Sequence, residues 1–288
     1  MAFLRAGAGH DAMVAVAGQV RHPVFIVGCG RSGTTILGSS LSRHPRIVYL
    51  NEPRRLWFAA YPEADIWTEK AAERGGRMVL TEADVDPAKS RVLHGLFHQV
   101  MVNNGGGLLV EKNPINNFRL SFIREIFPDA RFVHIVRNGR AVARSIARKA
   151  GSAAGGWFGR DGYKWKQLVQ CAEAQPETAG LAAICSSDYE KGLLEWRLSV
   201  EAVRRFLCRI PSAASCELSY DELVTSPVDT VNRVLRFIGM TEHAEVTGFV
   251  ATSIFHRDED MRTSKLSEKE LRIGGDLLVS MLKPGCVR

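Results

Sequence analysis

The stretch Val-Phe-Ile-Val-Gly-Cys-Gly-Arg-Ser-Gly-Thr-Thr, residues 24–35, decides the fold class of this chain. Its first four residues are apolar and bounded by Pro23 and Gly28, which is typical of a strand buried on both faces of a parallel sheet. Residues 34–43 have the apolar spacing of a helix. A strand, a glycine-rich loop and a helix in this order present backbone N–H groups and the positive helix end to a phosphate.

The loop departs from the common nucleotide-triphosphate pattern at one position. Gly28, Gly33 and Thr35 satisfy the frame G-x-x-x-x-G-K-[ST], but Thr34 stands where that pattern has lysine. Arg31, three positions earlier, supplies a positive charge instead. Because the missing lysine reaches the β- and γ-phosphates of a nucleoside triphosphate, the loop predicts a phosphate ligand other than Mg-ATP.

Size and composition indicate a globular protein. The 288 residues are 45% hydrophobic and 24% charged, ordinary values for a chain that buries a substantial core. Residues 1–20 predict a flexible leader and residues 21–288 a single domain, since no repeat or linker divides them. No apolar run approaches the roughly 20 residues of a membrane span, and the leader lacks a signal-peptide pattern. We therefore expect a cytoplasmic protein without a membrane span.

The charged residues indicate the class of ligand, and the cysteines indicate the redox state of the thiols. A net charge of +7 favours an anionic partner. Lysine and arginine are spread along the chain, without the basic stripe or the aromatic platform typical of nucleic-acid binding. We therefore expect a small polyanionic ligand and no nucleic acid. The six cysteines form no C-x-x-C pair and predict reduced thiols.

Short apolar runs and helical periodicities alternate along the chain. Further strands are predicted at residues 47–50, 108–110, 132–136 and 216–218, and further helices at residues 90–102, 117–127, 141–150, 193–207 and 230–238. The alternation predicts an α/β fold, a P-loop-containing parallel β-sheet flanked by helices on both faces. From residue 241 onward the pattern is too weak to predict an element.

Polar residues come at or just after the ends of the predicted strands, where ligands of such sheets bind. Glu52, Lys112 and Arg137 all lie at such ends. Ser145, eight residues after Arg137, lies two turns into the following helix, so both side chains can reach one anionic group. Taken alone, this arginine–serine spacing is weak evidence, because arginine is common where a helix starts.

Together these residues resemble the sulfotransferases that use 3′-phosphoadenosine 5′-phosphosulfate (PAPS) as donor. In that family the loop [KR]-S-G-T-T holds the 5′-phosphosulfate, and residues 31–35 match it. A segment R-[DN]-G-R-x-x-x-x-S holds the 3′-phosphate, and residues 137–145 match it. The run Lys-x-Pro, Phe-Pro-x-Ala-x-Phe and Val-Arg, at residues 112–114, 127–132 and 136–137, is similar to the protein-tyrosine and bacterial small-molecule branches.

The resemblance, which covers residues 23–239, implies transfer of a sulfuryl group from PAPS to a hydroxyl group. The acceptor would be a small molecule, a sugar or a lipid, and the in-line displacement would require no metal. Glu52 would be the general base, while Lys112 and Arg31 would stabilise the leaving oxygen and the phosphosulfate. The implied donor-binding residues are Gly30, Arg31, Ser32, Gly33, Thr34, Thr35, Arg137, Ser145 and Tyr220. From their positions, the candidates for acceptor contacts are Arg54, Trp57, Asn116 and Trp157.

Two further segments carry weaker signals. Residues 151–162 are rich in glycine and aromatic residues and predict either a surface loop or a mobile lid over the acceptor, extending over residues 150–185. Residues 262–265 are a faint match to a late basic and serine segment of the family.

Other interpretations stay open at the level of sequence. Instead of acting as a general base, Glu52 could form a surface ion pair with Arg54 or Arg55. Instead of stabilising the leaving oxygen, Lys112 could be a solvated lysine at a strand end. His94 and His98 have a spacing that can chelate, but no third ligand is evident, so no metal site is predicted. A nucleotide kinase or NTPase of related fold and a non-catalytic nucleotide-binding module remain as alternative functions.

Overall fold

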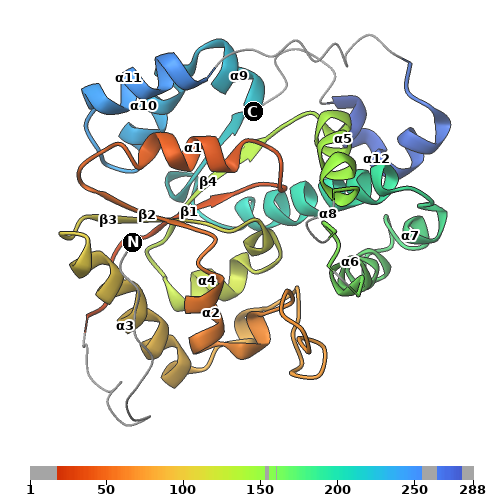
Figure 1. Ribbon diagram of the computed structural model, residues 1–288, viewed down its shortest axis with the longest axis horizontal. Helices are drawn as coiled ribbons and strands as arrows, with labels where there is room; N and C mark the ends of the chain where they lie inside the picture. Colours follow the sequence, from red (N-terminus) through yellow and green to blue (C-terminus); the bar gives the residue numbers. More distant parts are fainter. Residues whose placement is uncertain (1–17, 153–155, 160, 255–264, 281–288) are drawn as a thin grey trace.

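The computed structural model describes residues 18–152, 156–159, 161–254 and 265–280 (Figure 1). In these residues one five-stranded sheet has the order β2-β3-β1-β4-β5, and every neighbouring pair is parallel. Its strands are β1 (Val24–Val27), β2 (Ile47–Asn51), β3 (Leu108–Lys112), β4 (Arg131–Val136) and β5 (Ser215–Ser219). The predicted α/β fold is confirmed. The strand order reverses at β1, so the loop after β1 opens at the point where such sheets bind ligands.

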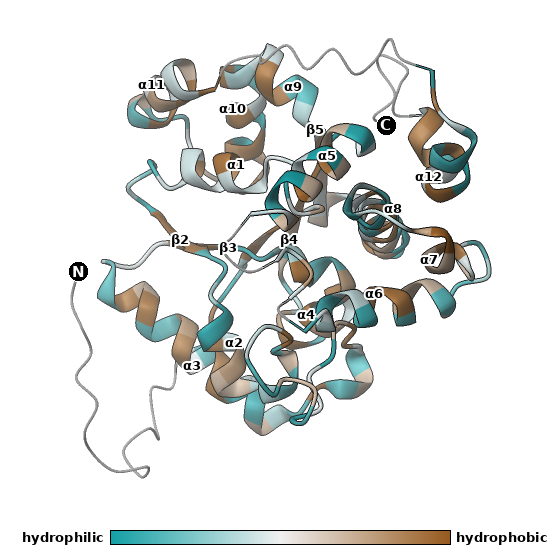
Figure 2. Ribbon diagram, turned by 45° about the vertical axis from the view of Figure 1, so that its right-hand side comes forward, coloured by the Kyte–Doolittle hydropathy of each residue, from teal (hydrophilic) through white to brown (hydrophobic). Residues whose placement is uncertain are grey.

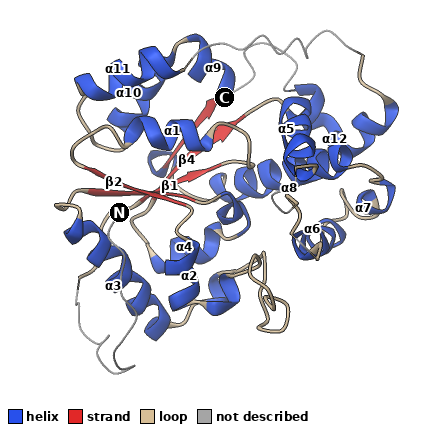
Figure 3. Cartoon of the chain, in the orientation of Figure 1, coloured by secondary structure: helices blue, strands red, loops and turns tan. Residues whose placement is uncertain are grey.

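Helices cover both faces of the sheet, as Figures 1 and 3 show. One face carries α1 (Thr34–Leu41), α9 (Tyr220–Thr225), α10 (Pro227–Phe237) and α11 (Ala244–Ser253). The other carries α2 (Arg54–Ala60), α3 (Pro87–Asn103) and α4 (Leu120–Ile126). A third group consists of α5 (Gly139–Ala150), α6 (Tyr163–Glu173), α7 (Leu181–Ile184), α8 (Asp188–Leu207) and α12 (Glu268–Ser280). Within the described ranges, no helix combines the length and the apolar character that crossing a membrane demands.

The central strand β1 is buried on both faces, which explains its unbroken apolar sequence. Val24 and Ile26 pack into the core under α1 and α10, while Phe25 and Val27 pack into the core under α3 and α4. Alternate residues of a strand point to opposite faces, so a strand covered on both faces needs an apolar residue at every position. Phe25 also contacts Phe132 of the neighbouring strand, with ring centroids 5.9 Å apart.

The helices carry the two-sided character expected of surface elements, with brown and teal segments alternating along α3 in Figure 2. The structure begins α8 at Asp188, five residues before the predicted start. The reason is a capping box at this end: the Ser187 side chain accepts from the Glu190 N–H, and the Glu190 side chain accepts from the Ser187 N–H.

The predictions for the leader and for the C-terminal segments have different outcomes. The predicted leader extends to residue 20, but Val20 is buried in the core and its N–H donates to His94. Residues 1–17 and 262–264 lie outside the described residues. The weak pattern after residue 241 conceals α11 and α12, which pack on α10 and α8.

A partly buried polar network joins β4, β5 and α8. His134 and Glu217 are 2.8 Å apart, and Arg204 donates to the same carboxylate at 2.7 Å. Burial raises the pKa of Glu217, but the hydrogen bonds from His134 and Arg204 outweigh it and lower the pKa to about 2. Burial also lowers the pKa of His134, so the ring is neutral and its Nδ1–H donates to the carboxylate.

This network predicts how stability depends on pH. Because the folded-state pKa of Glu217 is depressed, its contribution is complete near neutral pH and is lost as pH falls toward 2. Glu217→Gln should lower the free energy of unfolding at pH 7 by about 1–3 kcal/mol and flatten its decline as pH falls from about 5 toward 2, as measured by urea unfolding. Glu242→Gln, at an exposed pair with Arg236, should change little. An undiminished pH slope in Glu217→Gln would contradict this account.

Candidate active site

The loop between β1 and α1 forms a cradle whose shape depends on glycine. Gly33 has a φ of 96°, and a Cβ placed on it would lie 2.6 Å from the ring of Tyr220. Only glycine therefore allows the loop and Tyr220 to lie this close. The Gly28 N–H donates to the side chain of Asn117, which fixes the start of the loop to the segment after β3. Thr34 begins α1, so the first N–H groups of the helix open toward the loop.

The residues predicted to bind the donor meet around this cradle. The Arg31 Nε–H donates to the Ser145 hydroxyl at 3.0 Å, although the two residues are 114 positions apart. Arg137 donates to the backbone oxygen of Arg31 at 3.1 Å, and its guanidinium lies 4.1 Å from the ring centroid of Tyr220. Three segments of the chain thus bring two guanidinium groups, a hydroxyl and an aromatic ring to one place. Such a set suits a phosphorylated nucleotide.

The Arg31 backbone has a positive φ of 75°, in the left-handed region that residues with a side chain adopt infrequently. Glu52, directly after β2, also has a positive φ, of 50°. Residues held in such conformations concentrate at functional sites, because the surrounding structure must impose them. Here the Glu52 N–H donates to the Lys112 backbone oxygen at 2.7 Å, which extends the β2–β3 pairing by one residue.

A carboxylate between two cations lies at the ends of β2 and β3. Lys112 Nζ donates to one Glu52 oxygen at 2.8 Å, and Arg54 donates to the other at 2.6 Å. Only 2% of the Lys112 side chain is exposed, so the alternative of a solvated lysine is wrong. The Glu52 side chain is 31% exposed, and the expected alternative of a pair with Arg54 holds alongside the contact with Lys112.

The surroundings keep Glu52 ionised. Burial raises the pKa of its carboxyl, but the hydrogen bonds and charges of Lys112 and Arg54 outweigh burial, so the pKa lies below its usual range. Glu52 is therefore an anionic hydrogen-bond acceptor at neutral pH. A partly exposed carboxylate held beside a phosphate cradle is suited to accepting a proton.

A family model described as a sulfotransferase family matches residues 23–244. The chain belongs to the sulfotransferase family. The segment that matches includes the phosphate cradle, Glu52, Lys112 and Arg137, so the predicted resemblance is confirmed.

Curated relatives of this family member include protein-tyrosine sulfotransferases. It is 26% identical to protein-tyrosine sulfotransferase 2 of Gallus gallus over 212 residues, which are 71% of this chain and 55% of the relative. It is also 26% identical to protein-tyrosine sulfotransferase 1 of Danio rerio over 222 residues, 75% of this chain and 53% of the relative. The chain thus spans about half the length of these curated relatives.

Solved sulfotransferases share the fold. A sulfotransferase domain from the curacin biosynthetic pathway matches with a TM-score of 0.57 and 15% identity, covering 90% of this chain and 98% of that one. Sulfotransferase STF1 of Mycobacterium tuberculosis matches with a TM-score of 0.53 and 18% identity, covering 89% of this chain and 77% of that one. At these identities the likeness shows a common fold.

The predicted acceptor contacts have different outcomes in this sulfotransferase-family chain. The prediction is wrong for Trp57, which packs against Phe97 and Phe122 in the core and donates to the buried Glu111. Asn116 also donates to Glu111, but its side-chain oxygen has no partner in the described part of the chain, so its acceptor contact stays a prediction. Arg54 lies at the site, stacked 4.1 Å from the ring centroid of Trp67.

Trp157 lies directly against the phosphate cradle. A Cβ on Gly30 would be 2.7 Å from two carbons of the Trp157 ring. The surrounding segment is built into the fold, since the backbone N–H of Met78 donates to Gln167 of α6 and Lys164 of the same helix pairs with Glu195. Mobility of residues 150–185 stays a prediction, and residues 153–155 and 160 lie outside the described residues.

Sequence reasoning missed how several side chains shape the site. Asn117 anchors the cradle, and the helix predicted over 117–127 begins only at Leu120, after a 3-10 turn that presents the Asn117 side chain. Trp67 comes from an irregular segment with no periodic signal. Its indole N–H is buried without a partner among the described residues. His94, the candidate chelator, uses both ring nitrogens in hydrogen bonds to the backbone of Val20 and Ile126.

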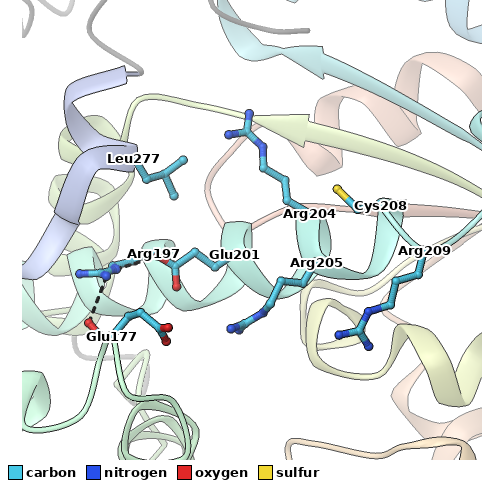
Figure 4. A pocket seen from close by; sticks show the side chains of 8 residues that line it. All are labelled: Glu177, Arg197, Glu201, Arg204, Arg205, Cys208, Arg209 and Leu277. Carbon is cyan, nitrogen blue, oxygen red and sulfur yellow. Dashed lines mark hydrogen bonds and ion pairs between the residues drawn. The ribbon is translucent and has the colours of Figure 1, made fainter.

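A separate hollow of about 550 Å³ runs along the C-terminal half of α8 (Figure 4). Its lining residues are Glu177, Arg197, Glu201, Arg204, Arg205, Cys208, Arg209 and Leu277. Arg197 is already paired with Glu201, and Arg204 with Glu217. The hollow contains none of the predicted site residues, so it is distinct from the cradle.

The ion pair between Lys112 and Glu52 predicts how the pKa of Glu52 responds to substitution of Lys112. Lys112→Met should raise the pKa of Glu52, because burial remains while the principal opposing partner is lost. The measurement is a carboxyl-carbon NMR titration of Glu52. Arg55→Met is the matched control, since Arg55 is exposed and lies outside the ion pair. If the two variants titrate alike, Lys112 does not set the protonation of Glu52.

Proposed function

We propose that this chain transfers a sulfuryl group from PAPS to a hydroxyl group of a small-molecule, sugar or lipid acceptor. The single observation that carries the proposal is the meeting of Arg31 with Ser145 at 3.0 Å, with Arg137 and Tyr220 beside them. Arg31 belongs to the loop that matches the family's 5′-phosphosulfate motif, and Ser145 to the segment that matches its 3′-phosphate motif. Their contact supports one nucleotide with phosphate groups at both positions.

The groups proposed to hold the donor fall into two sets, one for each end of the nucleotide. The loop N–H groups, the start of α1 and the hydroxyls of Ser32, Thr34 and Thr35 are suited to the 5′-phosphosulfate. The Ser32 hydroxyl is buried and has no partner among the described residues, so it is available to a ligand. Arg137 and Ser145 are suited to the 3′-phosphate, and the Tyr220 ring, stacked on Arg137, borders the nucleotide.

The chemistry is an in-line displacement. The acceptor oxygen forms a bond to sulfur while the bond from sulfur to the 5′-phosphate oxygen breaks, and that oxygen keeps the electron pair. Glu52 takes the proton of the acceptor hydroxyl, and Lys112, its ion-pair partner, neutralises the charge that grows on the leaving oxygen. Arg54 keeps Glu52 ionised and oriented through its hydrogen bond of 2.6 Å.

The acceptor class is proposed from the aromatic character of the site. Trp67 and Trp157 both lie near the ammonium of Lys164, at 5.5 and 4.2 Å from their ring centroids. This wall suits a small organic acceptor with an apolar face. A tyrosyl side chain of a peptide is the second candidate, because the curated relatives are protein-tyrosine sulfotransferases.

The rival functions have less support. Nucleotide kinases of the P-loop type use a lysine after the second loop glycine, and Thr34 occupies that position here. The second rival, a binding module without catalysis, leaves unexplained why a partly exposed carboxylate is held ionised beside the cradle.

Donor binding predicts a specific loss of affinity. Arg137→Ala should weaken binding of the product nucleotide, 3′-phosphoadenosine 5′-phosphate (PAP), roughly 10- to 100-fold, the scale of a lost charge-assisted hydrogen bond. Arg144→Ala, an exposed arginine next to Ser145 on the same helix, should leave the affinity nearly unchanged. Calorimetric titration measures both. Equal effects of the two substitutions would show a general charge effect in place of a 3′-phosphate site.

General-base catalysis predicts a separation of turnover from binding. Glu52→Gln should lower transfer of radiolabelled sulfate from PAPS by roughly 10²–10⁴-fold and leave PAP affinity nearly intact. Because the pKa of Glu52 is lowered, wild-type turnover should stay level around neutral pH and fall only below the usual glutamate range. A screen of hydroxyl acceptors provides the substrate. Undiminished turnover in Glu52→Gln would remove Glu52 from the mechanism.

A further inference from the structure

Behind the phosphate cradle lies a buried ion pair that takes no part in the chemistry described above. Glu195 of α8 and Lys164 of α6 are 2.6 Å apart, with 6% and 7% of their side chains exposed. A buried ion pair contributes little net stability, because the cost of removing both charges from water offsets their attraction. The position of the pair points to a role in orienting a neighbour.

That neighbour is Trp157. One oxygen of Glu195 accepts from Lys164, and the other accepts from the indole N–H of Trp157 at 2.7 Å. The ammonium of Lys164 also lies over the Trp157 ring, 4.2 Å from its centroid, in the geometry of a cation–π contact. The pair therefore fixes both the edge and the face of the indole.

The indole held in this way covers part of the cradle. Two carbons of its six-membered ring would lie 2.7 Å from a Cβ on Gly30, and the Pro114 side chain would lie 3.9 Å from the same point. Trp157 thus fills the space where the loop after β1 approaches the segment after β3. Cys29, next to Gly30, lies close enough to experience the charges of both Glu195 and Lys164.

Lys164 is also connected to Glu52, the proposed general base, through Trp67 and Arg54. Lys164 lies 5.5 Å from the ring centroid of Trp67, and Arg54 stacks on that ring at 4.1 Å. Arg54 in turn holds Glu52. A continuous line of side chains therefore runs from the proton acceptor to the phosphate loop, with Trp157 at its loop end.

We propose that Trp157 is the wall that keeps water away from the sulfur of the donor, and that Glu195 is the residue that positions this wall. The inference rests on the proposed sulfuryl transfer. In the competing reaction, the oxygen of water bonds to sulfur, the bond from sulfur to the 5′-phosphate oxygen breaks, and that oxygen keeps the electron pair. Glu52 takes the proton, and PAP and sulfate are released. An indole packed against the loop removes the room for that water.

The test measures release of free radiolabelled sulfate from PAPS without an acceptor, together with PAP affinity and thermal unfolding. Trp157→Ala should raise sulfate release about tenfold while PAP affinity stays near the wild-type value. Trp157→Phe keeps a ring but loses the N–H, and should have a smaller effect. Glu195→Leu should raise sulfate release as Trp157→Ala does, whereas Glu195→Gln keeps an accepting oxygen and should stay near wild type.

Trp165→Ala is the matched control. Trp165 belongs to α6 and packs against Phe158, with ring centroids 5.7 Å apart. Its removal should lower the unfolding temperature without raising sulfate release. Equal sulfate release from Trp157→Ala and wild type would overturn the proposal, and so would a rise in Trp165→Ala as large as that in Trp157→Ala.

The wild-type protein separates this inference from the function on which it rests. If wild type binds no PAP and consumes no PAPS, both the proposed function and the inference fail. If wild type binds PAP and transfers sulfate while Trp157→Ala releases sulfate no faster, only the inference fails.

Discussion

The ammonium of Lys112 is almost fully buried at the end of β3, and the carboxylate of Glu52 is its hydrogen-bond partner there. An unpaired ammonium at this depth would be costly, so the chain must bring a carboxylate to it. β2 does so because it pairs with β3 in a register that ends at Asn51 and Lys112. The next residue then turns back with a positive φ. This end of the candidate site is arranged around the Lys112–Glu52 pair.

The cradle between β1 and α1 depends on a different constraint, the close approach of backbones and rings that glycine permits. The loop after β1 touches Tyr220 at Gly33 and Trp157 at Gly30. Each of these aromatic rings contacts a cation, Tyr220 the guanidinium of Arg137 and Trp157 the ammonium of Lys164. The cradle is therefore bounded by rings whose positions the electrostatic contacts fix. This arrangement explains how a loop with few side chains can have a defined shape.

The features that follow from local sequence are predictable. The apolar spacing and the glycines of residues 24–41 are typical of a buried strand, a loop and a helix, and of few other structures. The family motifs alone predict that Arg31, Arg137 and Ser145 belong to one nucleotide site. Trp67 is not predictable, because its segment has no repeating pattern. Arg119 fixes that segment through backbone oxygens of Ala64, Arg77 and Met78, contacts that only the folded chain brings together. The role of Glu195 escapes prediction for the same reason.

The central claim is that the loop with arginine in place of the usual lysine selects a 3′-phosphorylated nucleotide over a nucleoside triphosphate. Calorimetric titration of the full chain with PAP and with ATP, each with and without magnesium, tests it most directly. We expect tight PAP binding that does not depend on magnesium, and weak ATP binding. Preferential binding of ATP in the presence of magnesium would contradict it.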